Sequence, residues 1–271
     1  HTCALTTTGT VECWGTAGWW GALGENIAYS DVPVPVPVIA DATALDVDYQ
    51  HSCALTATGE VLCWGRWYGH PPQPFSALTG FTALAVGSAE DCAVRDDGTV
   101  WCAAHWPYTY AAEATQVAEV SNAVAVAVAD DISCAVIDDG TVSCWGNAAA
   151  ATIPGLTDVI DVRADMATMC ALTATGEVWC WGDNVYGTLG NGTTQPSTVP
   201  VPVTGIDDAL QIEVHEDTAC ALLTDHTVTC WGESWDGAWS IGYTLVAPLE
   251  APRIAALWTP TDVGAICPEG T

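Results

Sequence analysis

The feature that most constrains this chain is a pair of cysteines separated by nine residues, which occurs six times. In the first copy, His1-Thr-Cys-Ala-Leu-Thr-Thr-Thr-Gly-Thr-Val-Glu-Cys-Trp-Gly15, two short apolar runs flank a turn rich in Thr and Gly. This pattern predicts a β-hairpin. If Thr6 faces Thr10, then Cys3 lies directly opposite Cys13, at a separation that suits a disulfide.

The same hairpin recurs along the whole chain. The pairs begin at residues 3, 53, 92, 134, 170 and 220, so successive copies lie 36 to 50 residues apart, which is typical of one blade of a β-propeller. The predicted hairpins span 1–15, 51–65, 90–104, 132–146, 168–182 and 218–232. We therefore expect a single all-β domain over residues 1–271, folded as a six-bladed β-propeller.

Each unit supplies about four strands. Apolar runs at 45–47, 84–86, 124–128, 159–162 and 210–214 precede five of the hairpins and are predicted to be inner strands. Extended segments with a proline at every second position, 32–38 and 199–203, follow two hairpins. Since proline cannot donate to a ladder, these segments are predicted to be outer, edge-type strands.

The cysteine pairs are predicted to be disulfides rather than metal or redox sites, because zinc ligands are usually two to four residues apart. The expected bridges are Cys3–Cys13, Cys53–Cys63, Cys92–Cys102, Cys134–Cys144, Cys170–Cys180 and Cys220–Cys230. Asp96-Asp97-Gly98 and Asp138-Asp139-Gly140 have the composition that turns require. The thirteenth cysteine, Cys267, is either a buried free thiol or an intermolecular bridge.

The repeats also resemble a known family. Cys-Trp-Gly stands at 13–15, 63–65, 144–146, 180–182 and 230–232, and the best copy continues as Trp181-Gly-Asp-Asn-Val-Tyr-Gly-Thr-Leu-Gly190. These motifs resemble the regulator-of-chromosome-condensation family of β-propellers, in its bacterial, extracellular, cysteine-paired form. The resemblance spans essentially the whole chain and implies a propeller. The family usually has seven blades, whereas this chain has six hairpins.

The family resemblance is specific for the fold and implies little about function. Family members include a nucleotide exchange factor that also binds chromatin, protein inhibitors of β-lactamases and many extracellular bacterial proteins. Tyr186 matches the family pattern and is expected to anchor its own loop.

The charge of the chain excludes several classes of partner. There are 33 Asp and Glu residues against four arginines and no lysine, which gives a net charge of −29. Nucleic-acid binding requires clustered basic residues, and an anionic membrane surface would repel this chain. No apolar run is long enough to span a membrane. With the predicted disulfides, this composition indicates a secreted protein, extracellular or at the cell surface.

The two ends of the sequence suggest how the ring closes. His1 occupies the repeat position of His51, so the first blade lacks a preceding inner strand, and residues 261–271 resemble that strand. This segment is expected to complete blade one. It either closes the ring within one chain or enters a neighbouring copy and creates a polymer.

Aromatic loops are the strongest candidate for a binding surface. Tryptophans gather in the segments after the hairpins, at Trp19, Trp20, Trp67, Trp106, Trp235 and Trp239. Loops that are equivalent in a propeller lie on one face or rim, so these side chains either form a patch for a protein or glycan or anchor their own loops. Asn191 begins the one N-x-Thr sequon and is a candidate glycosylation site.

No catalytic constellation is evident, and we expect no enzyme activity and no cofactor. Calcium could bridge Asp130 with Asp131, or Asp207 with Asp208, although the ordered spacing of a dedicated calcium loop is absent. The sequence therefore predicts a non-enzymatic structural propeller that assembles with itself. The alternative is a monomeric module that captures a protein or glycan through its aromatic loops.

Overall fold

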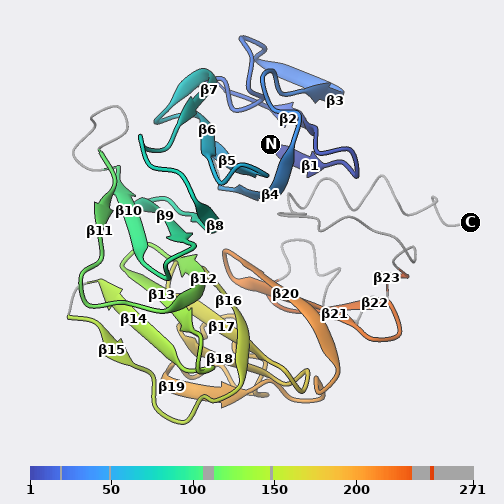
Figure 1. Cartoon of the computed structure of the whole chain (residues 1–271). Helices are drawn as coiled ribbons and strands as arrows, with labels where there is room; N and C mark the ends of the chain where they lie inside the picture. The colour runs from blue at the N-terminus through green and yellow to red at the C-terminus, as the bar shows by residue number, and fades with distance from the viewer. Residues whose placement is uncertain (19, 49, 106–112, 147–148, 234–244, 247–271) are drawn as a thin grey trace, which may run out of the picture.

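The protein is a six-bladed β-propeller in which six antiparallel sheets surround a central channel (Figure 1). The computed structural model describes residues 1–271 except 19, 49, 106–112, 147–148, 234–244 and 247–271. The described residues contain no helix long and apolar enough to cross a membrane. The predicted fold class and blade number are therefore confirmed.

Each sheet forms one blade. Blades one to three consist of β1 (Thr2–Leu5), β2 (Val11–Thr16) and β3 (Tyr29–Pro35); β4 (Ala42–Val47), β5 (His51–Thr56), β6 (Val61–Gly65) and β7 (Gly69–Pro74); and β8 (Phe81–Val86), β9 (Glu90–Arg95), β10 (Val100–Ala104) and β11 (Thr115–Gln116). Blades four to six consist of β12 (Ala123–Val128), β13 (Ile132–Ile137), β14 (Val142–Gly146) and β15 (Ala151–Thr152); β16 (Val159–Asp165), β17 (Thr168–Thr173), β18 (Val178–Gly182) and β19 (Ser197–Pro202); and β20 (Ala209–His215), β21 (Thr218–Leu223), β22 (Thr227–Gly232) and β23 (Leu245–Val246).

The hairpin register follows from the cysteine spacing. In β1 and β2, Cys3 pairs with Cys13 and Leu5 with Val11, as the position of the turn predicts. All six predicted bridges form, each between directly opposed residues whose Cα atoms lie 4.0–4.1 Å apart. Each disulfide therefore joins the two middle strands of one blade.

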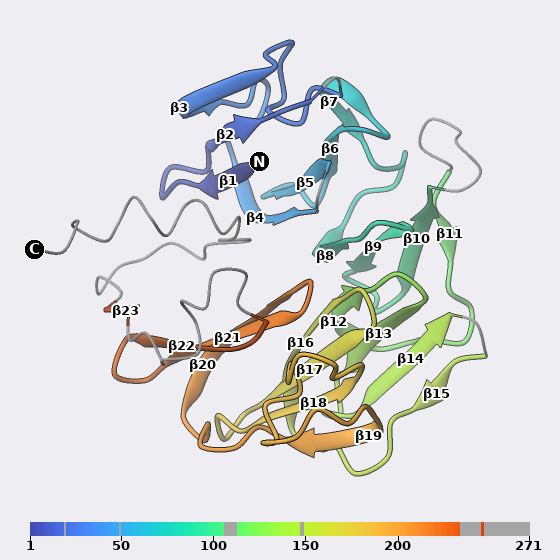
Figure 2. The same cartoon turned by 180° about the vertical axis from the view of Figure 1, so that it is seen from behind.

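Strand position within a blade follows the sequence pattern. The apolar runs form the inner strands β4, β8, β12, β16 and β20, which line the channel (Figure 1). The proline-rich segments form β3 and β19, the outermost strands of their sheets, where a missing N–H breaks no ladder bond. Seen from behind, the outer strands lie along the rim of the disc (Figure 2).

The hairpin turns hold consecutive blades together through backbone hydrogen bonds. Gly59, at φ +75°, accepts a bond of 3.0 Å from Phe81 N at the start of β8. Within blade three, Asp96 N donates to Gly80 O at 2.8 Å, which ties the hairpin turn to the start of the inner strand of its own blade. The first type of bond recurs at the other described blade boundaries, as Ala42 N to Gly9 O, Ala123 N to Gly98 O, Val159 N to Gly140 O and Ala209 N to Gly176 O.

The hydrophobic core is divided among the boundaries between blades. Five clusters of buried side chains lie in the described residues, one at each junction from blades one and two to blades five and six. Trp64, which is fully buried, extends from blade two to blade one and donates from Nε1 to Ala22 O at 3.0 Å. Each fully buried Val or Leu contributes about 1.5–3 kcal/mol, so these junctions supply much of the cohesion of the ring.

Two predictions about chain segments have different outcomes. Tyr186 is 49% exposed, so the prediction that it anchors its loop is wrong. The buried Asn184 holds the loop instead, since its Nδ2 donates to Gln195 O at 2.9 Å and its Oδ1 accepts from Leu189 N at 2.9 Å. The predicted closing strand, 261–271, lies outside the described residues, in which blade one has three strands.

Candidate functional site

Two of the six tryptophans predicted to form a binding patch come together in the structure. Trp20 follows β2 in blade one and is 47% exposed, whereas Trp67 follows β6 in blade two. The Arg66 guanidinium carbon lies 5.9 Å from the Trp20 ring centroid and 4.5 Å from that of Trp67. We call these three residues the aromatic stack. Trp19, Trp106, Trp235 and Trp239 lie outside the described residues.

Hydrogen bonds between Arg66, just after β6, and Gln50, just before β5, hold the stack in place. Arg66 Nη1 donates to Gln50 Oε1 at 2.6 Å, and its backbone N–H bonds to Gln50 O at 2.9 Å. Cation–π contacts of this kind are worth about 0.5–1 kcal/mol where exposed and more where water is excluded. The stack is therefore held in one arrangement, with its Trp20 end exposed to solvent.

Trp67 also links the stack to a buried group of polar side chains. Its ring stacks on His105 at a centroid distance of 5.1 Å and an interplanar angle of 19°. His105 follows β10 of blade three and is 3% exposed. The contact therefore crosses the boundary between blades two and three.

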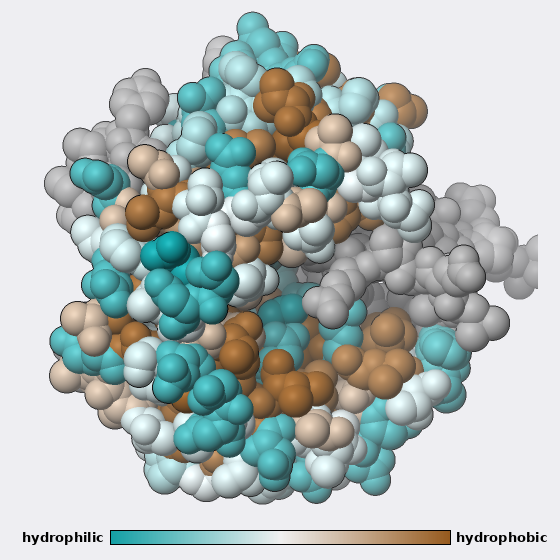
Figure 3. Space-filling model, viewed as in Figure 1, coloured by the Kyte–Doolittle hydropathy of each residue, from teal (hydrophilic) through white to brown (hydrophobic). Residues whose placement is uncertain are grey.

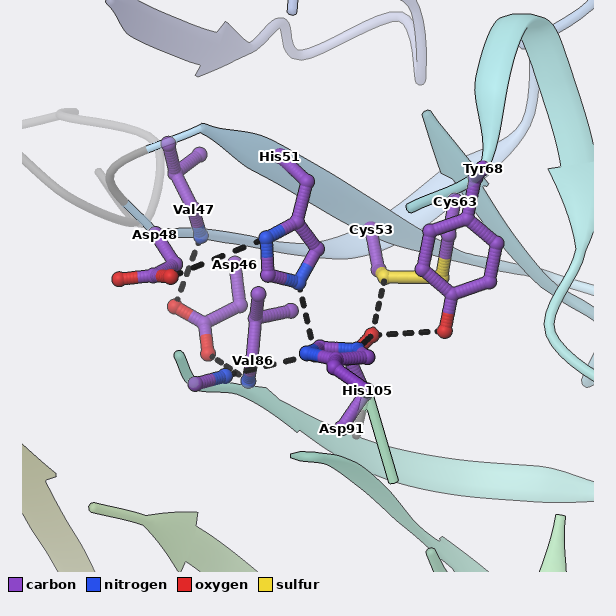
Figure 4. Close-up of a disulfide and its surroundings, with 11 residues drawn as sticks. Asp46, Val47, Asp48, His51, Cys53, Cys63, Tyr68, Val86, Asp91 and His105 are labelled. Atoms are coloured by element: carbon purple, nitrogen blue, oxygen red, sulfur yellow. Dashed lines mark hydrogen bonds and ion pairs between the residues drawn. A yellow bond between two sulfur atoms is a disulfide. The ribbon is translucent and has the colours of Figure 1, made fainter. Parts of the chain in front are cut away.

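The carboxylate of Asp91 lies at the centre of this buried group (Figure 4). His51 Nε2 lies 2.9 Å from Asp91 Oδ1, and His105 Nε2 lies 3.0 Å from Asp91 Oδ2. Tyr68 Oη donates to Asp91 Oδ2 at 2.7 Å, and Gly87 N–H donates to Oδ1 at 3.3 Å. His51, Tyr68, Asp91 and His105 are all buried, and we call them the histidine cluster.

Burial and charge shift the pKa values of His51, Asp91 and Tyr68. Burial disfavours a charged imidazole, but the charge and hydrogen bond of Asp91, with Asp48 nearby, raise the pKa of His51 above its usual value. Burial also opposes ionisation of Asp91, but the two histidines outweigh this effect and hold its pKa well below the usual range. Burial and the adjacent carboxylate raise the pKa of Tyr68.

The histidine cluster occupies the place of a tryptophan in other blades. At the position after the second cysteine, Trp64 and Trp231 reach the preceding blade and donate to Ala22 O and Thr188 O at 3.0 and 2.8 Å. In blade three this residue is Ala103. This departure from the repeat is evident in the sequence, but the sequence pattern did not predict that His105 and Asp91 form a buried cluster beside Ala103.

Family models match two parts of the chain. Both carry the description "Regulator of chromosome condensation (RCC1) repeat", and they cover residues 175–222 and 49–66. Solved structures agree over most of the propeller. Human WBSCR16 superposes with a TM-score of 0.72 at 19% identity, over 89% of this chain and 77% of that one. The fold is an RCC1-type propeller.

Two further solved structures superpose on most of this RCC1-type propeller. Yeast RCC1 (Prp20), crystallised with Kap60 bound, matches with a TM-score of 0.72 at 14% identity, over 85% of this chain and 67% of that one. The ectodomain of the Arabidopsis thaliana receptor kinase ACR4 matches with a TM-score of 0.56 at 20% identity, over 91% and 79%. No curated protein matches the sequence significantly.

The central channel of this RCC1-type propeller is acidic. It encloses about 520 Å³ and is lined by the inner strands together with His1. Arg163 Nη1 lies 2.8 Å from Asp161 Oδ1 and its Nε lies 3.4 Å from Glu213 Oε2. Burial, opposed in part by hydrogen bonds from Val86 and Val47, raises the pKa of Asp46 to about 7.

The mouth of the channel carries an apolar arc. Val124, Ile160 and Leu210 occupy the second positions of β12, β16 and β20 and are each about half exposed. Hydrophobic surface gathers around the channel over these blades (Figure 3). The equivalent residues of blades two and three, Thr43 and Thr82, are polar, so the arc covers one side of the mouth.

One hydrogen-bonded pair resembles a nucleophile with its base. His1 Nε2 lies 2.7 Å from Ser52 Oγ, but Ser52 is fully buried and cannot meet a substrate. This pair links blade one to blade two at the position where His51 and Asp91 link blade two to blade three. It is therefore part of the packing between blades.

The other predicted sites are only partly described. Asn191 is half-buried, and its Oδ1 accepts bonds from Thr193 N and Oγ1 at 3.0 and 2.8 Å, so its glycosylation stays a prediction. Cys267 lies outside the described residues. Asp130 accepts a hydrogen bond from Ser88, and calcium binding by the loop aspartates stays a prediction.

Proposed function

We propose that this RCC1-type propeller is a non-enzymatic binding module that captures a protein partner through the aromatic stack. The carrying observation is the exposed Trp20 ring, braced by Arg66 against Trp67. Tryptophan and arginine are enriched among the residues that dominate protein–protein binding energy. Rigid aromatic groups also lose little conformational entropy when a partner binds.

The setting that we propose is extracellular. Six disulfides indicate an oxidising compartment. The superposed ACR4 structure is the ectodomain of a receptor kinase, and the superposed yeast RCC1 structure has Kap60 bound. The net charge of −29 favours a partner whose contact surface is neutral or basic, because an acidic surface would be repelled.

A comparison of two exposed aromatic residues tests this function. Tagged wild-type protein is used to isolate a partner from the medium or surface extract of its source, and affinity is then measured with purified components. Trp20→Ala should weaken binding by about 30-fold or more, which corresponds to about 2 kcal/mol. The matched control is Tyr29→Ala, which removes a 63% exposed ring on the outer strand β3 and should leave affinity unchanged.

Two results would contradict the proposal. One is equal loss of affinity in both variants with unchanged folding. The other is a glycan ligand that binds with the same dependence on Trp20, because the partner is then not a protein.

Self-assembly is a second candidate function. It is favoured by blade one, which has three strands in the described residues where the other blades have four. A segment such as 261–271, supplied by a neighbouring molecule, would complete this sheet and link propellers into a polymer. Light scattering after size exclusion should then give large particles that disappear when this segment is deleted. A monomer of 28.2 kDa at every protein concentration would exclude polymerisation.

A further inference from the structure

We propose that the histidine cluster is a zinc site that fastens blade two to blade three, with His51 Nε2, His105 Nε2 and the Asp91 carboxylate as ligands. The Tyr68 hydroxyl donates to the same carboxylate at 2.7 Å and orients it, and the two Asp91 oxygens with the two histidine nitrogens make four donor atoms. Structural zinc sites are four-coordinate and take histidine nitrogen and carboxylate oxygen. Sequence reasoning predicted no metal here, because the ligands come from separate strands and loops.

The geometry of the ligand atoms fits one small ion. The donor atoms of His51, Asp91 and His105 all lie within 4.8 Å of one another. Zinc–nitrogen and zinc–oxygen bonds of about 2.0–2.2 Å at tetrahedral angles put neighbouring ligand atoms about 3.3 Å apart. The nitrogen–oxygen distances of 2.9 and 3.0 Å therefore need to open by only a few tenths of an ångström.

The outer nitrogens of both histidines face hydrogen-bond acceptors. His105 Nδ1 lies 3.4 Å from Ser88 O, within hydrogen-bond range, and His51 Nδ1 lies 3.7 Å from Asp48 Oδ2, which is a charge contact longer than a hydrogen bond. Histidine ligands usually donate their other N–H to a carboxylate or a backbone carbonyl, which leaves the second nitrogen free to bind the metal. The tautomer with both protons on Nδ1 thus presents both Nε2 lone pairs toward Asp91.

Zinc would supply the positive charge beside the Asp91 carboxylate while both imidazoles stay neutral. Within the described part of the chain, the hydrogen-bond partners of Asp91 are two histidines, a tyrosine and a backbone N–H, with no arginine among them. A buried charge is costly unless an opposite charge compensates it. Cys53 Sγ lies 4.0 Å from Asp91 but is bonded to Cys63, so the donors are nitrogen and oxygen alone. Imidazole donors favour zinc over calcium.

The neighbouring boundary shows what the site replaces. Between blades one and two, His1 meets Ser52, and Trp64 donates to Ala22 O. At the same positions between blades two and three, Asp91 replaces the serine and Ala103 replaces the tryptophan, while His105 is added. These departures converge on one point in space and provide the ligands that the first boundary lacks.

Zinc analysis of the whole oxidised protein tests the proposal. Wild-type protein is stripped with a chelator, reloaded with zinc chloride, and measured by elemental analysis and thermal unfolding. We expect one zinc per chain and a higher melting temperature in the loaded form. Asp91→Asn and His105→Gln should each weaken zinc binding by at least 100-fold. Asp48→Asn should weaken it by less than either ligand change, because Asp48 lies 3.7 Å from His51 Nδ1 and does not touch the metal.

The matched control is His215→Gln. His215 Nδ1 lies 2.9 Å from Asp165 Oδ2 in the channel, so it is also a histidine paired with an aspartate, but without a second histidine. This variant should keep full zinc content. Cobalt(II) bound to the stripped wild-type protein gives a second readout, because its visible spectrum reports nitrogen and oxygen ligation and should vanish in Asp91→Asn.

Two outcomes would overturn the zinc site. One is wild-type protein that takes up no more zinc than the His105→Gln variant. The other is zinc bound with no change in melting temperature and no visible cobalt spectrum. Near-UV circular dichroism of each variant distinguishes loss of zinc from loss of the fold. Neither outcome bears on the Trp20-dependent partner, so the two proposals fail separately.

Discussion

Aspartate side chains act in three ways in this acidic chain, according to their surroundings. In the hairpin turns, Asp97, Asp139 and Asp225 each accept bonds from the threonine two residues later, which lowers their pKa. Asp91 is buried among histidines. Asp46 lies in the channel, where burial raises its pKa to about 7 from 3.8. The same residue type thus favours opposite protonation states in different places.

Asp46→Asn should change how stability depends on pH. A raised pKa means that the folded state binds the proton more tightly than the unfolded chain. The stability from this group is fully present below the unfolded pKa of 3.8 and is lost as pH rises through about 7. Urea unfolding between about pH 4 and pH 8 should therefore show a smaller decline with rising pH in Asp46→Asn than in wild-type protein.

Asp139→Asn is the control, because the pKa of Asp139 is shifted in the opposite direction from that of Asp46. Bonds from Thr141 lower the pKa of Asp139, so its contribution is present above the unfolded pKa and is lost as pH falls. This variant should differ most from wild-type protein at neutral pH and least in acid. Parallel pH profiles for wild type and Asp46→Asn would contradict the role assigned to Asp46.

Sequence patterns predicted these residue roles unequally. The turn role of Asp97 and Asp139 follows from neighbouring residues, so a local pattern is enough. The partners of Asp91 come from β5, the loop after β6 and the end of β10, which meet only when two blades pack. The available signal was the departure of the third copy from its repeat at Asp91, Ala103 and His105.

The hairpin turn is the element that connects each blade to the next. Its glycine has a positive φ in five copies, and its carbonyl accepts the first backbone bond of the following inner strand. In blade six this position is His226, with φ +66°. A residue with a side chain in the left-handed region costs about 1–2 kcal/mol. Glycine avoids this cost, but it loses more backbone entropy on folding, which offsets part of the gain.

His226→Gly should therefore stabilise the protein, by about 0.5–1 kcal/mol in chemical unfolding. The reverse change at an equivalent turn, Gly59→Ala, should destabilise it by more, because the new Cβ would lie 2.8 Å from Gly80 Cα and N in the next blade. A loss of stability in His226→Gly would mean that the imidazole makes a favourable contact that outweighs the backbone strain.

Element boundaries were predictable where a periodic constraint applied. Opposed cysteines fix the register of each hairpin, and alternation of apolar residues identifies the inner strands. No such period governs the loop after β18, where Asn184 rather than Tyr186 makes the anchoring contacts. Loop anchors depend on which side chain can satisfy several backbone groups at once, and a pattern match does not reveal that.

At the scale of the whole molecule, cohesion combines one covalent bridge in each blade with noncovalent junctions between blades. Every described disulfide closes a loop with a sequence separation of 10. The aromatic stack and the histidine cluster both span junctions between blades. A series of contacts therefore runs from the exposed Trp20 ring through Arg66 and Trp67 to His105 in blade three.

Replacing one bridge with alanines, Cys134→Ala with Cys144→Ala, should lower the free energy of unfolding by about 2–3 kcal/mol by the chain-entropy relation. Urea unfolding in oxidising buffer measures the difference. Reducing agent should abolish the difference between the variant and wild-type protein, because both then lack all six described bridges. An unchanged unfolding midpoint would contradict a stabilising role for this bridge.

The binding surface was the least predictable feature at this scale. The tryptophans after the hairpins were evident in the sequence, but Arg66 was not, although it is one of four basic side chains in the chain. Its role depends on the distance between two loops in different blades, which the closure of the propeller sets.

The confinement of each described disulfide to one blade has an evolutionary consequence. A repeat can be duplicated, lost or exchanged as a unit without leaving a cysteine unpaired, because no described bridge has its two ends in different units. Chains built in this way can change in length by whole blades while each new copy carries its own cross-link. The junction between blades two and three differs, because the histidine cluster has members in both blades. Inserting a blade there would separate His51 from Asp91 and His105.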